Sequence, residues 1–392
     1  MLRLGKALHS NGYAAHRLEE ILSAVAQQMR LEAQFFSTPT AISAAFGPQD
    51  DQRTFLIRVE PGGVDLGKMA TLDRVTLRVL RGDLTPAEGS AMIDAIGAAP
   101  HRYGPAVTTL GFTIASAGAA RFLGGGPVEI VVAAVIGGVI GMLSLVIGRS
   151  IAAGRVFEPL AAFVAVVLAQ GAAHLVAPHA VFIAILAGLI VLIPGLTLTV
   201  AMNELATRHL ASGTARLSAA VMVFLAIIFG VALGDGLMER LLGTTPVLEP
   251  PSMPVWTELV ALAVAPLGFA ILLRAEPDDL GWIALAGWLA FIGSRAGAVL
   301  LDPNLGSFVG ALVVGVASNV YALLRDRPSQ ITLVPGVLLL VPGSIGFRSL
   351  ASLLDREVLL GMETAFTMTL VASGIVAGLL IANIVVPRRK SG

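Results

Sequence analysis

The chain has 392 residues, of which 56% are hydrophobic and 13% charged, and its formal net charge is zero. Soluble globular domains carry charges on roughly a quarter of their residues, so this composition predicts a polytopic membrane protein. The charge balance gives no reason to expect a nucleic-acid partner, and the absence of cysteine excludes disulfides, thiolate metal sites and cysteine nucleophiles.

Residues 1–102 predict a separate domain, because none of their apolar runs approaches the ~20 residues of a spanning helix. Met1 to Ser10 has no apolar core of the kind found in signal peptides, so we expect this domain to stay in the cytoplasm. Apolar residues between Leu8 and Met29 recur at helical spacing, with a break or cap at Asn11-Gly12.

The rest of this domain reads as two strands and two further helices. Residues 34–46 and 53–60 bracket the turn-forming GPQDD and predict two antiparallel strands. Helical spacing returns over 66–79, and Thr85 with Pro86 predicts the cap and first residue of a last short helix. A small α/β domain results.

From Gly104 onward the apolar runs predict ten membrane spans in two five-helix halves, 103–235 and 255–392, joined by an extracytoplasmic linker, 236–254. The spans lie at roughly 104–123, 128–147, 157–176, 180–202 and 217–234, and then at roughly 255–273, 280–300, 305–324, 331–347 and 364–386.

Two pairs of matching dipeptides favour an inverted repeat. Gly111-Phe112 in the first span matches Gly268-Phe269 in the sixth, and Pro194-Gly195 in the fourth matches Pro342-Gly343 in the ninth. An odd number of spans per half makes the halves face opposite ways.

The positive-inside rule predicts that both termini lie in the cytoplasm of a bacterial-type inner membrane. The side assigned as inner collects Arg149, Arg155, Arg208, Arg216, Arg274, Arg325, Arg327 and the tail Pro387-Arg388-Arg389-Lys390, whereas the outer side has Arg121, Arg240, Arg348 and Arg356.

The two proline-glycine pairs are the strongest functional signal. Pro194 and Pro342 each remove an amide donor from an apolar helix, which frees carbonyls that only protein or a water-filled cavity can satisfy. Interrupted helices at matching places in two halves point to a transporter's substrate site.

Several stretches resemble the threonine/serine exporter family. The N-terminal HSNGYAAHRLEE and STPTAI resemble that family's opening signature, and LIPGLTLTVAMNELATRHLASGTARL and ITLVPGVLLLVPGSIGFRSL are similar to its two membrane halves. The resemblance implies an inner-membrane exporter of threonine and serine driven by the proton-motive force. Some relatives are associated instead with succinate export.

Polar residues near the breaks supply candidate substrate ligands. Thr197, Thr199 and Asn203 follow the first break and Ser344 follows the second, so they can bind an amino acid's carboxylate, ammonium and hydroxyl groups. The alternative is that these hydroxyls re-satisfy local carbonyls. The full predicted set is Pro194, Gly195, Thr197, Thr199, Asn203, Arg295, Asn319, Pro342, Gly343 and Ser344.

Charged residues inside spans are costly and therefore suggest function. Arg295 in the seventh span can hold a substrate carboxylate; its alternatives are an ion pair or snorkelling to the surface. Candidates for proton coupling are Glu158, His174, Glu204 and Glu363, which the alternative interpretation places in hydrated interfaces.

The N-terminal domain is the alternative location of the function. It has no nucleophile elbow and no triad spacing, so we expect it to gate the inner mouth or mediate assembly through Arg17, Glu20, Thr38 and Pro39.

We expect no cofactor and no metal. The predicted partners are a small amino acid, protons and the lipid bilayer, with a homo-oligomer left open. The sequence thus predicts a proton-coupled exporter of small hydroxy amino acids. A dicarboxylate exporter and a membrane-tethered hydrolase are the alternatives.

Overall fold

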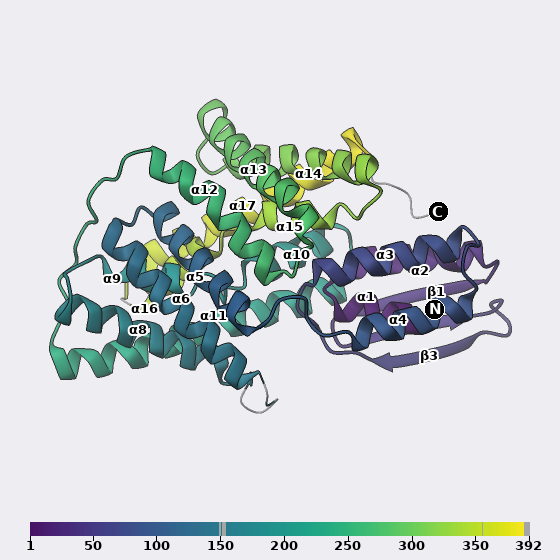
Figure 1. Ribbon diagram of the computed structural model, residues 1–392, viewed down its shortest axis with the longest axis horizontal. Helices are drawn as coiled ribbons and strands as arrows, with labels where there is room; N and C mark the ends of the chain where they lie inside the picture. The colour runs from purple at the N-terminus through teal and green to yellow at the C-terminus, as the bar shows by residue number, and fades with distance from the viewer. Residues whose placement is uncertain (149, 151–153, 355, 388–392) are drawn as a thin grey trace.

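The computed structural model describes residues 1–148, 150, 154–354 and 356–387. Arg149, Arg388, Arg389 and Lys390, which contributed to the predicted orientation, lie outside the described residues. The N-terminal domain forms one end of the molecule and a bundle of apolar helices forms the other (Figure 1).

The N-terminal domain packs four helices with one small antiparallel sheet. Its elements are α1 (Leu2–Ser10), α2 (Ala15–Gln28), β1 (Ala33–Thr38), β2 (Ala41–Phe46), β3 (Arg53–Arg58), α3 (Leu66–Leu80) and α4 (Pro86–Ala98). The strands follow the order β1-β2-β3. The predicted cap of α4 is confirmed: the Thr85 hydroxyl accepts from the Glu88 amide, and the Glu88 carboxylate accepts from the Thr85 amide.

The prediction of a single strand over 34–46 was wrong, because a tight turn divides it into β1 and β2. Thr38 pairs with Ala41 across the turn, and the Ala41 amide donates to the Thr38 hydroxyl at 3.1 Å. Pro39 has no amide with which to continue a ladder, so the chain reverses there.

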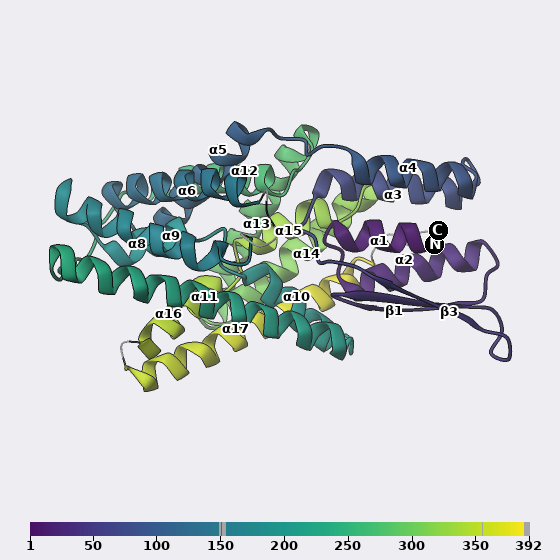
Figure 2. The same ribbon diagram turned by 90° about the horizontal axis from the view of Figure 1, so that it is seen from below.

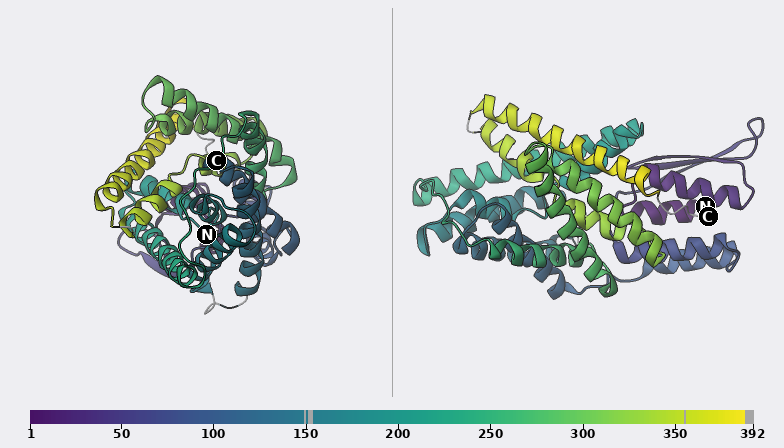
Figure 3. Two further views of the ribbon diagram at one scale, coloured as in Figure 1. Left: turned by 90° about the vertical axis from the view of Figure 1, so that its left-hand side faces the viewer. Right: turned by 90° about the horizontal axis from the view of Figure 1, so that it is seen from above.

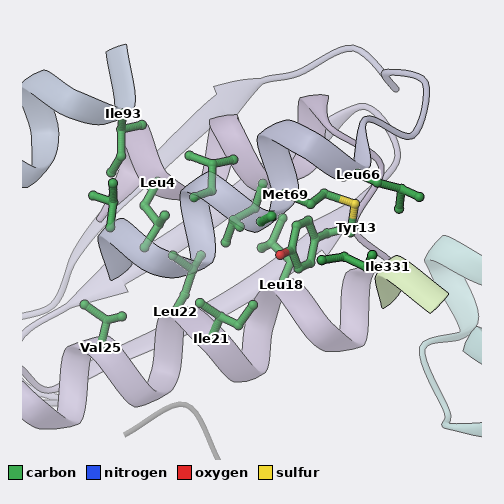
Figure 4. Close-up of a cluster of buried hydrophobic side chains, with 14 of the residues drawn as sticks. Leu4, Tyr13, Leu18, Ile21, Leu22, Val25, Leu66, Met69, Ile93 and Ile331 are labelled. Carbon is green, nitrogen blue, oxygen red and sulfur yellow. The ribbon is translucent and has the colours of Figure 1, made fainter. Parts of the chain in front are cut away.

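The domain core is made by the apolar faces of α1, α2 and α3 packed on β2. Leu18, Leu22, Ile42 and Leu72 are all fully or almost fully buried there. Figure 4 shows this core continuing past Tyr13 to Ile331 of the membrane bundle. The domain and the bundle therefore share one hydrophobic cluster.

Beyond the domain the chain is almost entirely helical. The helices are α5 (Pro105–Phe122), α6 (Pro127–Ile147), α8 (Phe157–Leu175), α9 (Val181–Gly188), α10 (Gly195–Ala206), α11 (Leu210–Leu242), α12 (Trp256–Leu272), α13 (Leu280–Leu300) after the short turn η1 (Pro277–Asp279), α14 (Gly306–Arg325), α15 (Gln330–Leu338), α16 (Gly343–Leu354) and α17 (Val358–Val385).

Seven segments of the described chain are long and apolar enough to cross a membrane. Large apolar side chains such as Val131, Val146 and Phe229 are exposed on these helices, as expected for a lipid-facing surface. The molecule is therefore a multi-span helical membrane protein with a small α/β domain, as the composition predicted.

The fourth and ninth predicted spans are both interrupted. The fourth is divided into α9 and α10, and the ninth into α15 and α16, at the two proline-glycine pairs. The fifth is longer than predicted, since α11 has 33 residues and spans ~50 Å. It crosses the bundle beneath α10 and reaches toward the domain (Figure 2).

The helix contacts in the two halves correspond. Helix α8 packs on α11 as α14 packs on α17, and α10 packs on α11 as α16 packs on α17. Helix α17 then runs back to the end of the molecule that holds the domain (Figure 3). These matching contacts agree with the predicted inverted repeat of ten spans, which stays a prediction.

The halves meet where α5 and α12 lie antiparallel. A Cβ on Gly118 would lie 2.6 Å from the Cβ of Ala265, and a Cβ on Gly268 would lie 2.8 Å from the amide nitrogen of Ala115. Both glycines are therefore needed for the close approach of the two helices.

Gly268→Ala should destabilise the protein, because the added methyl meets backbone. We expect the midpoint of thermal unfolding in detergent to fall by ~2 °C or more, measured by intrinsic fluorescence. The control is Gly171→Ala in α8, where a Cβ meets nothing within 4 Å and alanine favours the helix. Equal midpoints for the two variants would contradict this packing.

Candidate functional site

The two helix breaks touch one another inside the bundle. A Cβ on Gly195 would lie 2.2 Å from Val341 Cγ1 and 3.5 Å from Gly343 Cα, and a Cβ on Gly343 would lie 2.6 Å from Ile193 Cγ2. We call this contact the crossing. Pro194, Gly195, Pro342 and Gly343, all predicted site residues, are buried there together.

The crossing is electrostatically distinctive. Helices α10 and α16 both begin at it, so their first amides, which have no helical acceptor, lie beside it. Helices α9 and α15 end shortly before it, which frees carbonyls on the same segments. Such interrupted helices offer both positive and negative partial charges to a small polar ligand.

A cavity of about 290 Å³ lies on the side of the crossing away from the domain, and we call it the distal cavity. Its polar side chains are Ser294, Arg295 and Ser344, and residues 338–341 contribute to its wall. Phe122, Phe269 and Phe291 supply apolar surface. Two of the predicted ligands, Arg295 and Ser344, are thus brought together.

Arg295 lines this cavity and also fits its two alternatives, because its side chain is 64% exposed and forms an ion pair. Its guanidinium donates to Glu258 at 3.0 Å and lies 5.2 Å from the centre of the Phe291 ring. Glu258 in turn lies 3.4 Å from Arg121 at the end of α5. A single carboxylate therefore stands between two guanidinium groups at this end of the bundle.

A smaller cavity of about 100 Å³ lies on the domain side of the crossing, and we call it the proximal cavity. Thr199 and Asn203 of α10 line it together with Gln330 and with His16 and Arg17 of the domain. The Thr199 hydroxyl donates to the Gly195 carbonyl at 3.1 Å, so it does re-satisfy a local acceptor.

The proximal and distal cavities approach each other at the end of α15, where Val337 lines the first and Leu338 lines the second, although Arg295 lies far from the domain. Ile283 belongs to the domain's core cluster, and Arg295 lies more than three turns further along α13, ~18 Å away. The crossing lies between the two cavities.

Glu204 anchors the domain instead of lying in a hydrated interface. It is fully buried, its Oε1 accepts from the Ala15 amide at 2.9 Å, and both its oxygens accept from the Arg216 guanidinium at 3.1 Å. Ala15 is the first residue of α2, where an anion is also favoured by the helix dipole. The interfacial alternative for Glu204 is therefore wrong.

Further polar contacts join the domain to the bundle. Glu19 accepts from the Ser37 amide at 2.6 Å and lies 3.3 Å from His209, and burial raises the pKa of the Glu19 carboxyl. The Leu66 amide donates to the Leu273 carbonyl at 2.9 Å, which fixes α3 against the end of α12.

The four residues of the predicted domain surface, Arg17, Glu20, Thr38 and Pro39, lie in different environments. Arg17 lines the proximal cavity and pairs with exposed Glu20 at 2.9 Å. The carbonyl of Thr38, next to Pro39, lies 3.2 Å from His9 Nε2, and burial lowers the pKa of His9. Arg17 of this set therefore lines a cavity that the transport helices also line.

The other predicted residues lie away from the crossing or line neither cavity. Asn319 donates to Asn383 at 3.1 Å and to the Val386 carbonyl at 2.8 Å, and so secures the end of α17. Thr197 is half-buried and lines neither cavity, Glu158 is half-buried at the start of α8, and His174 and Glu363 are exposed. Their functional roles stay predictions.

The structure adds two residues that the sequence analysis did not name, Glu258 and Ser294, which accompany Arg295. His16 lines the proximal cavity with its Nε2 3.5 Å from Asn203. Glu258 carried one signal in the sequence: it is an acid in the first turn of an apolar helix, as is the candidate Glu158.

A multi-span helical bundle with two interrupted helices in contact and a cavity on each side is typical of secondary transporters. Two family models of threonine/serine exporters match the chain, one over residues 1–238 and the other, described as Threonine/Serine exporter, ThrE, over residues 258–385. The chain belongs to the threonine/serine exporter family, a family of membrane transporters and not of enzymes.

Curated relatives agree with the resemblance seen in the sequence. A Mycobacterium tuberculosis protein named "Probable threonine/serine exporter" is 27% identical, over 97% of this chain and 75% of its own length. The "Threonine/serine exporter" of Corynebacterium glutamicum is 24% identical, over 83% of this chain and 68% of its own.

Fungal proteins also align with the chain. "Pheromone-regulated membrane protein 10" of Saccharomyces cerevisiae is 24% identical over 94% of this chain, which spans about half (48%) of that relative's length. The comparison with solved structures gave no match.

Glu204→Gln should loosen the domain from the bundle, because the partly buried guanidinium of Arg216 would lose its counter-charge at a cost of ~3 kcal/mol. We expect faster deuterium uptake in peptides that cover the start of α2. The control is Glu20→Gln, which removes only an exposed ion pair. Uptake equal to the control's would contradict an anchoring role for Glu204.

Proposed function

We propose that this protein exports L-threonine and L-serine, driven by the proton-motive force, and binds them in the distal cavity. The observation that carries the proposal is the Arg295–Glu258 ion pair, 3.0 Å long, whose arginine lines a cavity with two serine hydroxyls. The names of the bacterial relatives support this substrate class.

The chemistry of the distal cavity suits a zwitterion that carries a hydroxyl. The substrate carboxylate pairs with Arg295, and its ammonium pairs with Glu258 and the carbonyls freed before the break. Ser294 and Ser344 bond the substrate hydroxyl. At about 290 Å³ the cavity lies at the lower end of ligand-pocket volumes, which suits a small amino acid.

Glu258 also bears on the alternatives. A dicarboxylate has no ammonium group to pair with Glu258, whereas an amino acid has one, and this favours an amino acid over a succinate-type substrate. A hydrolase in the N-terminal domain has no support from the family or from the relatives' names.

Transport in this proposal is alternating access around the crossing. Ten spans form two inverted halves with both termini in the cytoplasm of a bacterial inner membrane, and movement of one half opens the proximal and distal cavities in turn. Residues Gly12 to Arg17 line the proximal cavity, so the domain caps the inner mouth. The domain therefore gates the entry of substrate.

The test is efflux of labelled threonine from proteoliposomes with an imposed pH gradient. Arg295→Gln should lower efflux ~10-fold or more, since a charge-assisted bond is worth about 1.5–3 kcal/mol. Ser344→Ala should weaken threonine and serine efflux but spare alanine, which has no hydroxyl.

Matched controls separate binding from general damage. Arg240→Gln removes an exposed arginine at the end of α11, and Ser373→Ala removes a hydroxyl that bonds only within α17. Both should transport like the parent. Full threonine efflux by Arg295→Gln, or efflux of succinate but not threonine by the parent, would overturn the proposed site or substrate.

A further inference from the structure

Glu129 is a buried carboxylate that no cation balances among the described residues. It lies in the first turn of α6 with 2% of its surface exposed. One oxygen accepts from the Gly126 amide at 2.8 Å and the other from the Ala180 amide at 2.7 Å. The other deeply buried acids of the described chain all face arginine: Asp65 with Arg274, Glu204 with Arg216 and Asp279 with Arg327.

Glu129 has a counterpart in the second half. Pro127-x-Glu129 opens α6, and Pro277-x-Asp279 opens α13, the matching helix. Glu129 holds the residue just before α9, and Asp279 holds Arg327, just before α15. Each acid therefore fastens its helix to the loop that leads into the broken helix of its half.

The two acids differ in chemistry. Arg327 pairs with Asp279, and the Tyr321 hydroxyl donates a further hydrogen bond to it at 2.8 Å. Glu129 has only neutral amide donors. When a proton binds, its carboxyl becomes a donor at one oxygen and accepts more weakly, so the bond from the Ala180 amide weakens.

A cavity beside Ala180 offers a route for protons. It measures about 590 Å³, lies at the end of the bundle away from the domain, and is lined by Asp235, Glu239 and Glu249 with Arg348 as its one described cation. An excess of carboxylates in a cleft raises the local concentration of protons.

Neither Glu129 nor His179 lines this cavity, but Glu129 bonds to Ala180 and His179 precedes it, and Ala180 does line the cavity. His179, next to Ala180, is buried, and its Nε2 has no partner in the described structure, so it can relay a proton. Arg121 of α5 is engaged with Thr257 and Glu258, and Gln170 of α8 with Asp235. His174 of α8 is exposed, and its Nδ1 lies 3.1 Å from the Gln170 carbonyl. Arg348 of α16 lies over the Phe182 ring. Pro251 of the linker packs against Gly126.

We propose that Glu129 is the proton-binding group that couples transport to the proton gradient. A proton from the outer cavity binds the Glu129 carboxylate and releases the Ala180 amide. Helix α9 then moves, and its C-terminal end shifts the crossing. The proton leaves to the inner side when the transporter returns to its starting state. This inference rests on the proposed proton-driven export.

The experiment follows threonine-dependent proton movement with a pH dye trapped in proteoliposomes, alongside labelled threonine flux. Glu129→Gln mimics the protonated carboxyl. We expect it to lose proton movement and to lower gradient-driven efflux to the rate without a gradient, while threonine–threonine exchange continues. Glu129→Asp should restore proton movement with a shifted pH profile, and Glu357→Gln, which changes an exposed acid with no assigned role, should match the parent.

The outcomes separate the two proposals. A parent that carries no threonine overturns the proposed function itself, and a parent that carries threonine without protons overturns the coupling. Proton movement retained in Glu129→Gln, or exchange lost from a correctly folded Glu129→Gln and not restored by Glu129→Asp, overturns the role of Glu129 alone.

Discussion

The contact between Gly195 and Gly343 fixes most of the membrane architecture. Neither position has room for a side chain, because Val341 and Ile193 fill the space that a Cβ would need. Two helices therefore stop and two restart at one place, and the backbone groups freed there can be met only by protein or by small polar molecules. The positions of both cavities follow from this contact.

Helix α10 transmits the state of the crossing to the domain. It begins at Gly195 and, within its 12 residues, carries Glu204, which binds the domain through Ala15. A helix of this length is a nearly rigid rod of ~18 Å, so a shift at its first turn displaces the domain anchor. Asn203 on the same helix lies beside His16, which brings the wall of the proximal cavity into the same movement. In the proposed mechanism, α10 therefore links substrate entry to the crossing.

Local chemistry was readable from the sequence, whereas long-range partners were not. The helix breaks and the Thr85 cap depend on neighbouring residues and were predicted correctly. The turn at Thr38-Pro39 was visible as a turn, yet the aromatic and β-branched residues on either side concealed that it separates two strands. Arg295 could be singled out because a charge inside a span is costly, but Glu258 comes from another helix and its proximity is a result of packing.

The burial of individual carboxylates was the property that the sequence could predict least. Glu204 looked like a hydrated acid at a span end because the domain that covers it lies almost two hundred residues earlier in the chain. Glu129 was not among the candidates from the sequence, and local capping explains only its bond to Gly126. Only the fold shows that Ala180 occupies its other oxygen and that Pro251 covers the turn.

The difference between the two ends of the bundle has a physical consequence for coupling. Were Glu129 and Asp279 in identical surroundings, both loops into the broken helices would respond alike to protons. The Arg327 guanidinium pairs with Asp279, while only neutral amides bond Glu129. This asymmetry does not set the direction of net transport, which the gradients determine. It selects which broken helix responds to proton binding, and that helix is the one that leads to Pro194.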